Sequence, residues 1–99
     1  MYLQEKDLNK IRAACEKHKV DKLYVYGSVL TNQFKDSSDI DFLVRFDGVQ
    51  LQHYFDNYID FKETLMKIVE RHVDLLEVQT LKNPILKKSI ENNRLLIYG

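Results

Sequence analysis

Three aspartates lie within segments that are otherwise mostly apolar. Asp39 and Asp41 stand two positions apart in the segment 38–44, and Asp74 stands in the segment 73–76. Side chains two apart on a β-strand point to the same face, so Asp39 and Asp41 would present adjacent carboxylates. Two ionised carboxylates repel each other, and their removal from water costs further free energy. A divalent cation would offset both costs, and Mg²⁺ prefers oxygen ligands of this kind.

Asp74 extends this pair if the strand that carries it lies beside the strand of Asp41. Three carboxylates would then bind a metal ion and accept a proton from an attacking hydroxyl group. Each aspartate also has a simpler explanation by itself. Ser38 and Asp39 would cap a turn, Asp41 would reach solvent from a strand edge, and Asp74 would end a strand.

Gly27 and Ser28 end the strand that precedes the aspartates. A glycine at this position lets a phosphate group approach the backbone closely. The Ser28 hydroxyl and the neighbouring N–H groups would donate hydrogen bonds to phosphate oxygens, more so if a helix begins there. The Gly-Ser pair alone is a common end of a strand, so it indicates a phosphate site only together with the aspartates.

The pattern of apolar residues predicts the elements that would position these side chains. In chain order they are a helix at 3–19, a strand at 20–27, a turn and polar loop at 28–38, a strand at 39–46, a helix at 51–71 that is irregular near its start, a strand at 73–78, a helix that begins at Asn83-Pro84 and ends near Asn92, and a strand at 95–98. This order predicts an α+β fold, an α/β two-layer arrangement with helices packed on one sheet.

The composition limits the class of protein. The 99 residues predict a single domain over residues 1–99. Fifteen basic and 15 acidic residues give a net charge of zero, so no basic excess would attract nucleic acid or a membrane surface. No apolar run approaches the roughly 20 residues of a membrane span. The N-terminus also lacks a signal-peptide pattern, so a cytoplasmic protein is expected.

The cysteine and histidines add little chemistry of their own. A single cysteine, Cys15, excludes an intrachain disulfide and a cysteine-based zinc site, and it is expected to be a reduced, half-buried helix residue. The histidines His18, His53 and His72 are scattered, and no two of them stand at metal-ligand spacing. They are expected at the surface or rim, although His72 would share a face with Asp74 if both lay on one strand.

The spacing of the motifs resembles that of a known group of enzymes. Gly27-Ser28, ten intervening residues and then Asp39-x-Asp41 are similar to the signature of the DNA polymerase β-like nucleotidyltransferase superfamily. Asp74 stands where that superfamily places its third carboxylate, and the closing helix and strand resemble the end of its minimal, single-domain members. The resemblance covers essentially the whole chain. It implies the nucleotidyltransferase fold, in which a mixed β-sheet has helices packed mainly on one face.

The resemblance also implies a role for each residue. Asp39, Asp41 and Asp74 would be the metal ligands and the catalytic residues, with two Mg²⁺ ions bridging the phosphates of a nucleoside triphosphate. Asp74 would also help to activate the acceptor hydroxyl, and Gly27 and Ser28 would hold the β- and γ-phosphates. The reaction would be in-line attack on the α-phosphorus, with pyrophosphate leaving.

Two positions depart from the pattern of many relatives, which place arginine directly after Gly-Ser and glycine three residues later. Here these positions are Val29 and Asn32. A basic phosphate contact is then missing, or it comes from another residue such as Lys35 or Arg45. The departure bears on catalytic rate more than on fold.

The minimal members of the superfamily suggest a partner. They are often paired with a separate helical HEPN protein, a ribonuclease toxin that the nucleotidyltransferase, as antitoxin, inactivates by AMP transfer onto a tyrosine. By this resemblance the chain would be a Mg²⁺-dependent antitoxin with ATP as donor and a HEPN-type partner in trans as acceptor. It would contact neither nucleic acid nor a membrane. A three-carboxylate set on a chain with little room for an acceptor site motivates this hypothesis.

Two alternatives stay open. One is a binding-only antitoxin that neutralises its partner by contact, which Val29 and Asn32 favour. The other is a nucleotidyltransferase that modifies small molecules of the aminoglycoside type, with an acceptor pocket built by dimerisation. The sequence leaves open the base of the nucleotide, the acceptor residue, the number of AMP groups and whether the chain forms a homo-oligomer.

Overall fold

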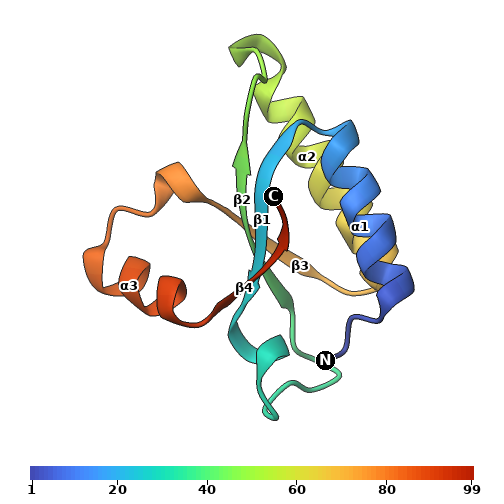
Figure 1. The fold of residues 1–99 in the computed structure, drawn as a ribbon, viewed down its shortest axis with the longest axis vertical. Coiled ribbons are helices and arrows are strands. Elements are labelled where there is room, and N and C mark those ends of the chain that lie inside the picture. The colour runs from blue at the N-terminus through green and yellow to red at the C-terminus, as the bar shows by residue number, and fades with distance from the viewer.

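The computed structural model describes all residues from 1 to 99 (Figure 1). Its helices and strands follow the order predicted from the sequence, with boundaries that differ by a few residues. In chain order they are α1 (Glu5–Lys17), β1 (Val20–Tyr26), the 3₁₀ helix η1 (Gly27–Leu30), β2 (Ile40–Phe46), α2 (Leu51–Val69), β3 (Val73–Glu77), the 3₁₀ helix η2 (Val78–Thr80), α3 (Pro84–Asn92) and β4 (Arg94–Tyr98).

The four strands form one mixed sheet in the order β3-β2-β1-β4. β1 pairs with β2 and with β4 in antiparallel orientation, whereas β2 and β3 are parallel. A parallel pair requires a long crossover connection, and α2 provides it. The strand that carries Asp74 is therefore the direct neighbour of the strand that carries Asp41.

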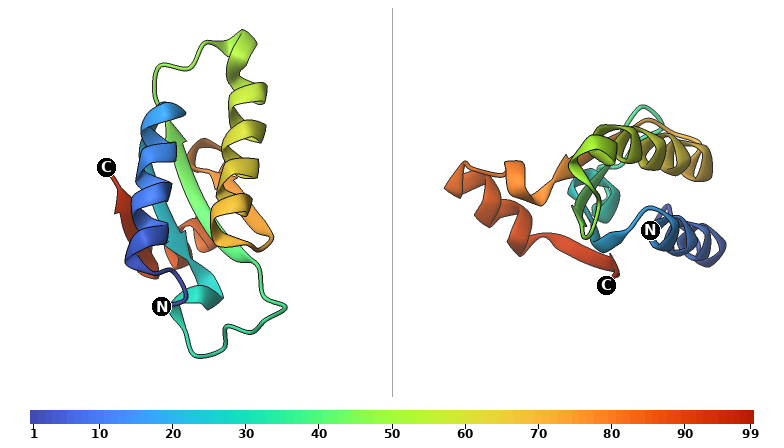
Figure 2. Two further views of the ribbon diagram at one scale, coloured as in Figure 1. Left: turned by 90° about the vertical axis from the view of Figure 1, so that its right-hand side faces the viewer. Right: turned by 90° about the horizontal axis from the view of Figure 1, so that it is seen from above.

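The helices are divided unequally between the two sides of the sheet. Figure 2 shows α1 and α2 side by side on one side, whereas α3 lies on the other. This arrangement confirms the predicted α+β fold with helices mainly on one face.

Alternation along the strands produces the buried face of the sheet. Ile40, Phe42 and Val44 of β2 are fully buried, and they belong to one core with residues of both long helices. The helices contribute side chains at helical spacing, namely Ile11, Ala14 and Cys15 from α1 and Phe61, Leu65 and Val69 from α2. Burial of each large apolar side chain stabilises the fold by about 1.5–3 kcal/mol, which holds the two helices on this face.

The predicted irregularity at the start of α2 is wrong. α2 is one regular helix of 19 residues. The apolar side chains of Leu51 and Phe55 are 90% and 71% exposed in its first turns, so they do not belong to the buried stripe and disturb the sequence pattern. Neither α2 nor any other helix of the structure is long and apolar enough to span a membrane.

His18 and Cys15 lie deeper than predicted. His18 is 3% exposed, whereas a surface position was expected, and Cys15 is fully buried rather than half-buried. The His18 ring bonds to the Ala14 carbonyl oxygen through Nδ1 at 2.7 Å and to Asp60 Oδ2 through Nε2 at 2.6 Å, which satisfies both nitrogens inside the fold. Burial raises the pKa of the Cys15 thiol to about 12, which keeps it protonated.

The start of α3 confirms the predicted cap. The Asn83 side chain accepts hydrogen bonds from the backbone N–H groups of Ile85 and Leu86 at 3.0 and 3.3 Å. Pro84 occupies the first helical turn, where its missing N–H costs no hydrogen bond. The cap matters because a helix of nine residues has little stability of its own.

Candidate functional site

One residue from each strand contributes to a row across the sheet. Asp74 of β3 is in register with Asp41 of β2, Asp41 is in register with Tyr26 of β1, and Tyr26 is in register with Arg94 of β4. Side chains of directly paired residues lie on the same face, with neighbouring strands about 4.8 Å apart. The row lies on the face away from α1 and α2, because Asp41 alternates with Ile40, Phe42 and Val44, which pack in the core with those helices.

The carboxylates of this row influence one another. Asp41 is half-buried, and its pKa is raised first by burial, then by the charge of Asp74 and then by that of Asp39. Asp39 is exposed and immediately precedes β2. The structure thus brings all three predicted aspartates within electrostatic range of each other.

A divalent cation fits this donor set. The carboxylates supply hard oxygen donors, and a cation would relieve the repulsion that raises the Asp41 pKa. No three His, Cys, Asp or Glu side chains converge into a ready-made set of ligands in this structure. Mg²⁺ needs no such set, because one or two carboxylates commonly bind it together with waters and the phosphates of a substrate.

Gly27 lies directly against the Asp41 carboxylate. Its φ is +79°, in the left-handed region, and a Cβ atom at this position would lie 2.5 Å from Asp41 Oδ2. No other residue fits both requirements without a shift of the carboxylate. Ser28 follows in the first turn of η1, so the predicted phosphate-binding pair adjoins the acidic row.

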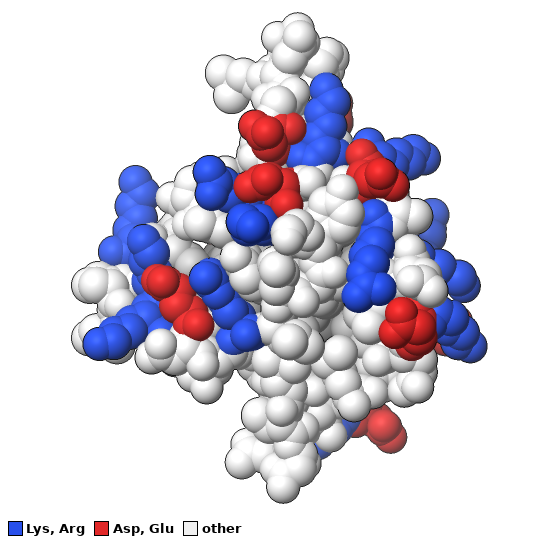
Figure 3. All heavy atoms as spheres, in the orientation of Figure 1, with Lys and Arg blue, Asp and Glu red and all other residues white.

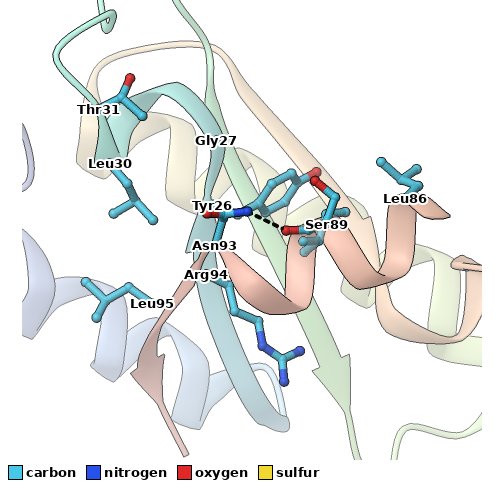
Figure 4. Close-up of a pocket in the computed structure, with 10 residues that line it drawn as sticks. Tyr26, Gly27, Leu30, Thr31, Leu86, Ser89, Asn93, Arg94 and Leu95 are labelled. Carbon is cyan, nitrogen blue, oxygen red and sulfur yellow. Dashed lines mark hydrogen bonds between the residues drawn. The ribbon is translucent and has the colours of Figure 1, made fainter. Parts of the chain in front are cut away.

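A pocket of about 680 Å³ opens beside Gly27, between η1, α3 and β4 (Figure 4). Its volume is within the range of about 300–1,000 Å³ that small-molecule sites occupy. In Figure 4 the Tyr26 ring points toward Ser89 of α3, and Asn93 Nδ2 donates a hydrogen bond to the Ser89 carbonyl oxygen at 2.9 Å. Five of the 10 residues that line the pocket are hydrophobic, and Leu30 is one of them.

Tyr26 is a site residue that the sequence analysis missed. It stands in the row between Asp41 and Arg94 and also lines the pocket. Burial, followed by the charges of Asp41 and Asp74, raises the pKa of its hydroxyl to about 12. The hydroxyl is therefore a neutral hydrogen-bond donor at the boundary between carboxylates and pocket. Its position directly before Gly27 was the available sequence signal.

Arg94 is the second residue that the sequence analysis missed. It lines the pocket together with Gly27, and its guanidinium lies 4.1 Å from the centre of the Tyr24 ring. Nothing in the local sequence marks it, because only the pairing of β4 with β1 brings it into the row.

The basic residues proposed from the sequence lie elsewhere. Arg45 stands four residues along β2 from Asp41, which is about 13 Å of strand, and its Nε lies 3.5 Å from Asp21 Oδ2. Neither Arg45 nor Lys35 lines the pocket beside Gly27. Val29, at the position where many relatives have arginine, is 4% exposed and belongs to the core.

His72 lies just before β3 and so does not share a strand face with Asp74. Its carbonyl oxygen accepts a hydrogen bond from the Ile40 N–H at 3.1 Å. This backbone bond joins the starts of β3 and β2, next to the aspartates.

Comparisons with known proteins agree with the fold. A family model described as Polymerase beta, Nucleotidyltransferase matches residues 9–99. Two relatives from Methanocaldococcus jannaschii, each named as a protein adenylyltransferase, are 37% and 36% identical to this chain over 83 residues. Both matches cover 84% of this chain and 80% of the relative.

Three solved structures resemble this one. A structure described as a minimal nucleotidyltransferase has a TM-score of 0.76 at 21% identity, and the match covers 91% of this chain and 88% of that chain. A toxin–antitoxin complex with AMP-PNP has a TM-score of 0.70 at 20% identity, covering 93% and 73% of the two chains. A complex of tri-AMPylated HEPN toxin with MNT antitoxin from Shewanella oneidensis has a TM-score of 0.67 at 19% identity, covering 98% and 73%.

The three lines of observation converge. The mixed sheet and the acidic row beside Gly27-Ser28 agree with the family match over residues 9–99. The chain therefore belongs to the polymerase beta nucleotidyltransferase family, and it is a nucleotidyltransferase.

Proposed function

We propose that the chain is a Mg²⁺-dependent antitoxin that transfers AMP from ATP to a tyrosine hydroxyl of a HEPN-type toxin. The observation that carries this proposal is the register of Asp41 with Asp74, with Asp41 against the Gly27 turn. This arrangement supports a metal site at carboxylates that lie beside a turn suited to phosphate. The pocket at Gly27 adds space of the size that a nucleotide requires.

Each site residue has a distinct role in this proposal. Asp39, Asp41 and Asp74 hold Mg²⁺, which when bound stabilises negative charge on the attacking and departing oxygens. Gly27 and Ser28 bind the β- and γ-phosphates through backbone N–H groups and the Ser28 hydroxyl.

The proton transfer falls to Asp74. Asp74 accepts the proton of the acceptor hydroxyl through a carboxylate oxygen as the hydroxyl oxygen bonds to the α-phosphorus. The bond from that phosphorus to pyrophosphate breaks in the same displacement. Asp74 suits this role because it is exposed at the edge strand of the sheet, open to an acceptor from another chain.

The partner is inferred from the structural neighbours. Two of them are toxin–antitoxin complexes, one described with AMP-PNP and one with an AMPylated HEPN toxin. The name of the curated relatives, protein adenylyltransferase, supports transfer of AMP onto a protein. Together they favour a protein hydroxyl as acceptor.

Mass spectrometry of the candidate toxin, after incubation with the chain, ATP and Mg²⁺, tests the proposal. We expect the toxin to gain one or more AMP groups on tyrosine. Asp41→Asn should abolish this gain, because it removes a carboxylate of the metal site without a change in side-chain size. A toxin of unchanged mass, in the presence of folded wild-type chain, would refute AMP transfer.

A binding-only antitoxin is the second candidate, and burial of Val29 is the observation that favours it. The side chain at this position cannot reach a phosphate. Asp41→Asn separates the two functions. If neutralisation of the toxin requires transfer, this variant fails to protect, whereas a contact-based antitoxin protects as well as the wild type.

A further inference from the structure

Arg71 connects the segment before β3 to the loop before β2. Its Nη1 donates hydrogen bonds to three backbone carbonyl oxygens of that loop, those of Lys35 at 2.6 Å, Asp36 at 3.1 Å and Ser38 at 2.9 Å. The last of these peptide units leads directly into Asp39. One charged side chain therefore fixes the path of the backbone just before the acidic motif.

Two aromatic rings hold the Arg71 guanidinium in place. Its central carbon lies 4.6 Å from the centre of the Tyr2 ring and 4.5 Å from that of the Phe34 ring. The Tyr2 hydroxyl in turn donates a hydrogen bond to the Val69 carbonyl oxygen at 2.9 Å. The two ring centres lie 5.4 Å apart, so both rings contact the guanidinium from adjacent directions. Contacts of a cation with ring faces stabilise by about 0.5–2 kcal/mol each.

The loop that Arg71 contacts has few other restraints. Lys35 and Ser38 bond to each other, through Lys35 N to Ser38 Oγ and Ser38 N to the Lys35 carbonyl oxygen, both at 3.0 Å. The next backbone bond runs from Ile40 N to the His72 carbonyl oxygen. Arg71 adds three further bonds between the same two segments.

We propose that Arg71 is a positioning residue that sets the geometry of the carboxylates for metal and nucleotide binding. It stands three residues before Asp74, and its partners end one residue before Asp39. It thereby fixes the entry to β2 and the entry to β3 relative to each other. The inference rests on the proposed function, because it concerns the same carboxylate site.

Only arginine suits this position. A guanidinium is planar, so it can stack on the Tyr2 and Phe34 rings while its Nη1 donates to the loop carbonyl oxygens. A lysine ammonium keeps the charge and can donate to carbonyl oxygens, but it is a compact, strongly hydrated point charge that has no planar group to stack on the two rings. Arg71→Lys is therefore the variant that removes the positioning and retains the charge.

Mn²⁺ binding followed by electron paramagnetic resonance, in the presence of a non-hydrolysable ATP analogue, measures the effect without turnover. We expect Arg71→Lys to weaken Mn²⁺ binding by about 10- to 100-fold, as loss of residues that orient metal ligands commonly does. Hydrogen exchange on the metal-free protein should show faster exchange at the Ser38 and Ile40 amides. Arg12→Lys is the matched control.

Arg12 suits this purpose because its Nε also donates to a backbone carbonyl oxygen, that of Ile97 at 3.2 Å, away from the acidic row. Both variants lose an arginine–backbone bond, so a general loss of stability would affect them alike. Only a positioning role makes the Arg71 variant alone lose affinity for Mn²⁺.

The outcomes separate the role of Arg71 from the proposed function. Folded Arg71→Lys with Mn²⁺ affinity within twofold of the wild type, or with unchanged exchange at Ser38 and Ile40, overturns the role of Arg71. Wild-type chain that binds Mn²⁺ but transfers no AMP refutes the proposed function and leaves the positioning role standing. Wild-type chain that binds no Mn²⁺ refutes both.

Discussion

At the scale of single residues, Asp41 and Gly27 depend on each other. The Asp41 carboxylate occupies the space that a side chain at position 27 would fill, and the positive φ of Gly27 turns the chain there into η1. In the proposed site, this close approach would give the phosphate-binding turn and the metal-binding carboxylates a common boundary. It also makes position 27 sensitive to the addition of a single methyl group.

Gly27→Ala should lower the free energy of unfolding and weaken Mn²⁺ binding, because the new Cβ would displace the Asp41 carboxylate. Gly48→Ala is the control, since Gly48 has φ +78° with no atom within 4 Å of the added Cβ. Backbone strain of about 1–2 kcal/mol is common to both variants. Chemical denaturation and Mn²⁺ titration should show a larger loss for position 27 and a metal effect there alone. Equal losses, with metal binding intact, would contradict the steric coupling.

Tyr26→Phe tests whether the hydroxyl in the acidic row binds substrate. With a pKa of about 12, this hydroxyl stays protonated at neutral pH and can donate to a phosphate. We expect KM for ATP to rise by about tenfold, since a hydrogen bond to a charged group contributes about 1.5–3 kcal/mol. Tyr24→Phe, two residues earlier on the same face, should leave KM unchanged. Equal KM values for the two variants and the wild type would exclude this role.

At the scale of elements, a histidine–aspartate pair joins α1 to α2. The two His18 ring nitrogens face oxygen atoms of different helices, the Ala14 carbonyl oxygen of α1 and Asp60 Oδ2 of α2. The hydrogen bond from His18 is the largest cause that lowers the pKa of the Asp60 carboxyl. Desolvation opposes it, and the nearby positive charges of Lys17 and Lys67 add to it. The ring also packs against Phe61, with ring centres 5.3 Å apart. The pair therefore stabilises the packing of the two helices.

Asp60→Asn should lower Tm at pH 7, and the difference from the wild type should disappear in acid. The pKa of Asp60 in the folded chain lies below its unfolded value of about 3.9, so its contribution is complete above that pH. It is lost as the pH falls through the lower, folded pKa. Asp56→Asn, an exposed change one turn earlier in α2, is the control. A Tm difference that persists unchanged at pH 2 would contradict this account.

At the scale of the whole molecule, the core that stabilises the fold also holds β2, the strand that carries Asp41. Ile40, Phe42 and Val44 of β2 pack in the core with both helices, whereas Asp41 of the acidic row lies on the opposite face of the same strand. Charges of both signs are interspersed over the upper and lateral parts of the face seen in Figure 3, whereas its lower part carries few charges.

Phe61→Ala should destabilise the whole chain by about 3–5 kcal/mol, because Phe61 is fully buried and contacts His18 and Phe46. That is a large part of the 5–15 kcal/mol that typically stabilises a folded protein. Phe55→Ala, on the same helix but 71% exposed, should change stability by less than about 0.5 kcal/mol. Urea denaturation measures both. Comparable losses would contradict a core centred on Phe61.

The sequence by itself determined the elements and their faces. Alternation in β2 and helical spacing in α2 are local patterns, and each identifies the buried side of its own segment. The cap at Asn83 was predictable for the same reason, because a cap involves residues within one turn. The motif from Gly27 to Asp41 was equally visible, since the spacing of its residues lies within one stretch of chain.

Only the tertiary structure decided which distant residues meet. The register of Asp41 with Asp74, the position of Arg94 beside Tyr26 and the bond of His18 to Asp60, 42 positions away, depend on how separate elements pack. Strand order depends on how all the elements pack around one core, and the hydrophobic pattern of each strand fixes its register only once its neighbour is known. The acidic motif was therefore visible in the sequence, whereas the residues that surround it became visible only in the fold.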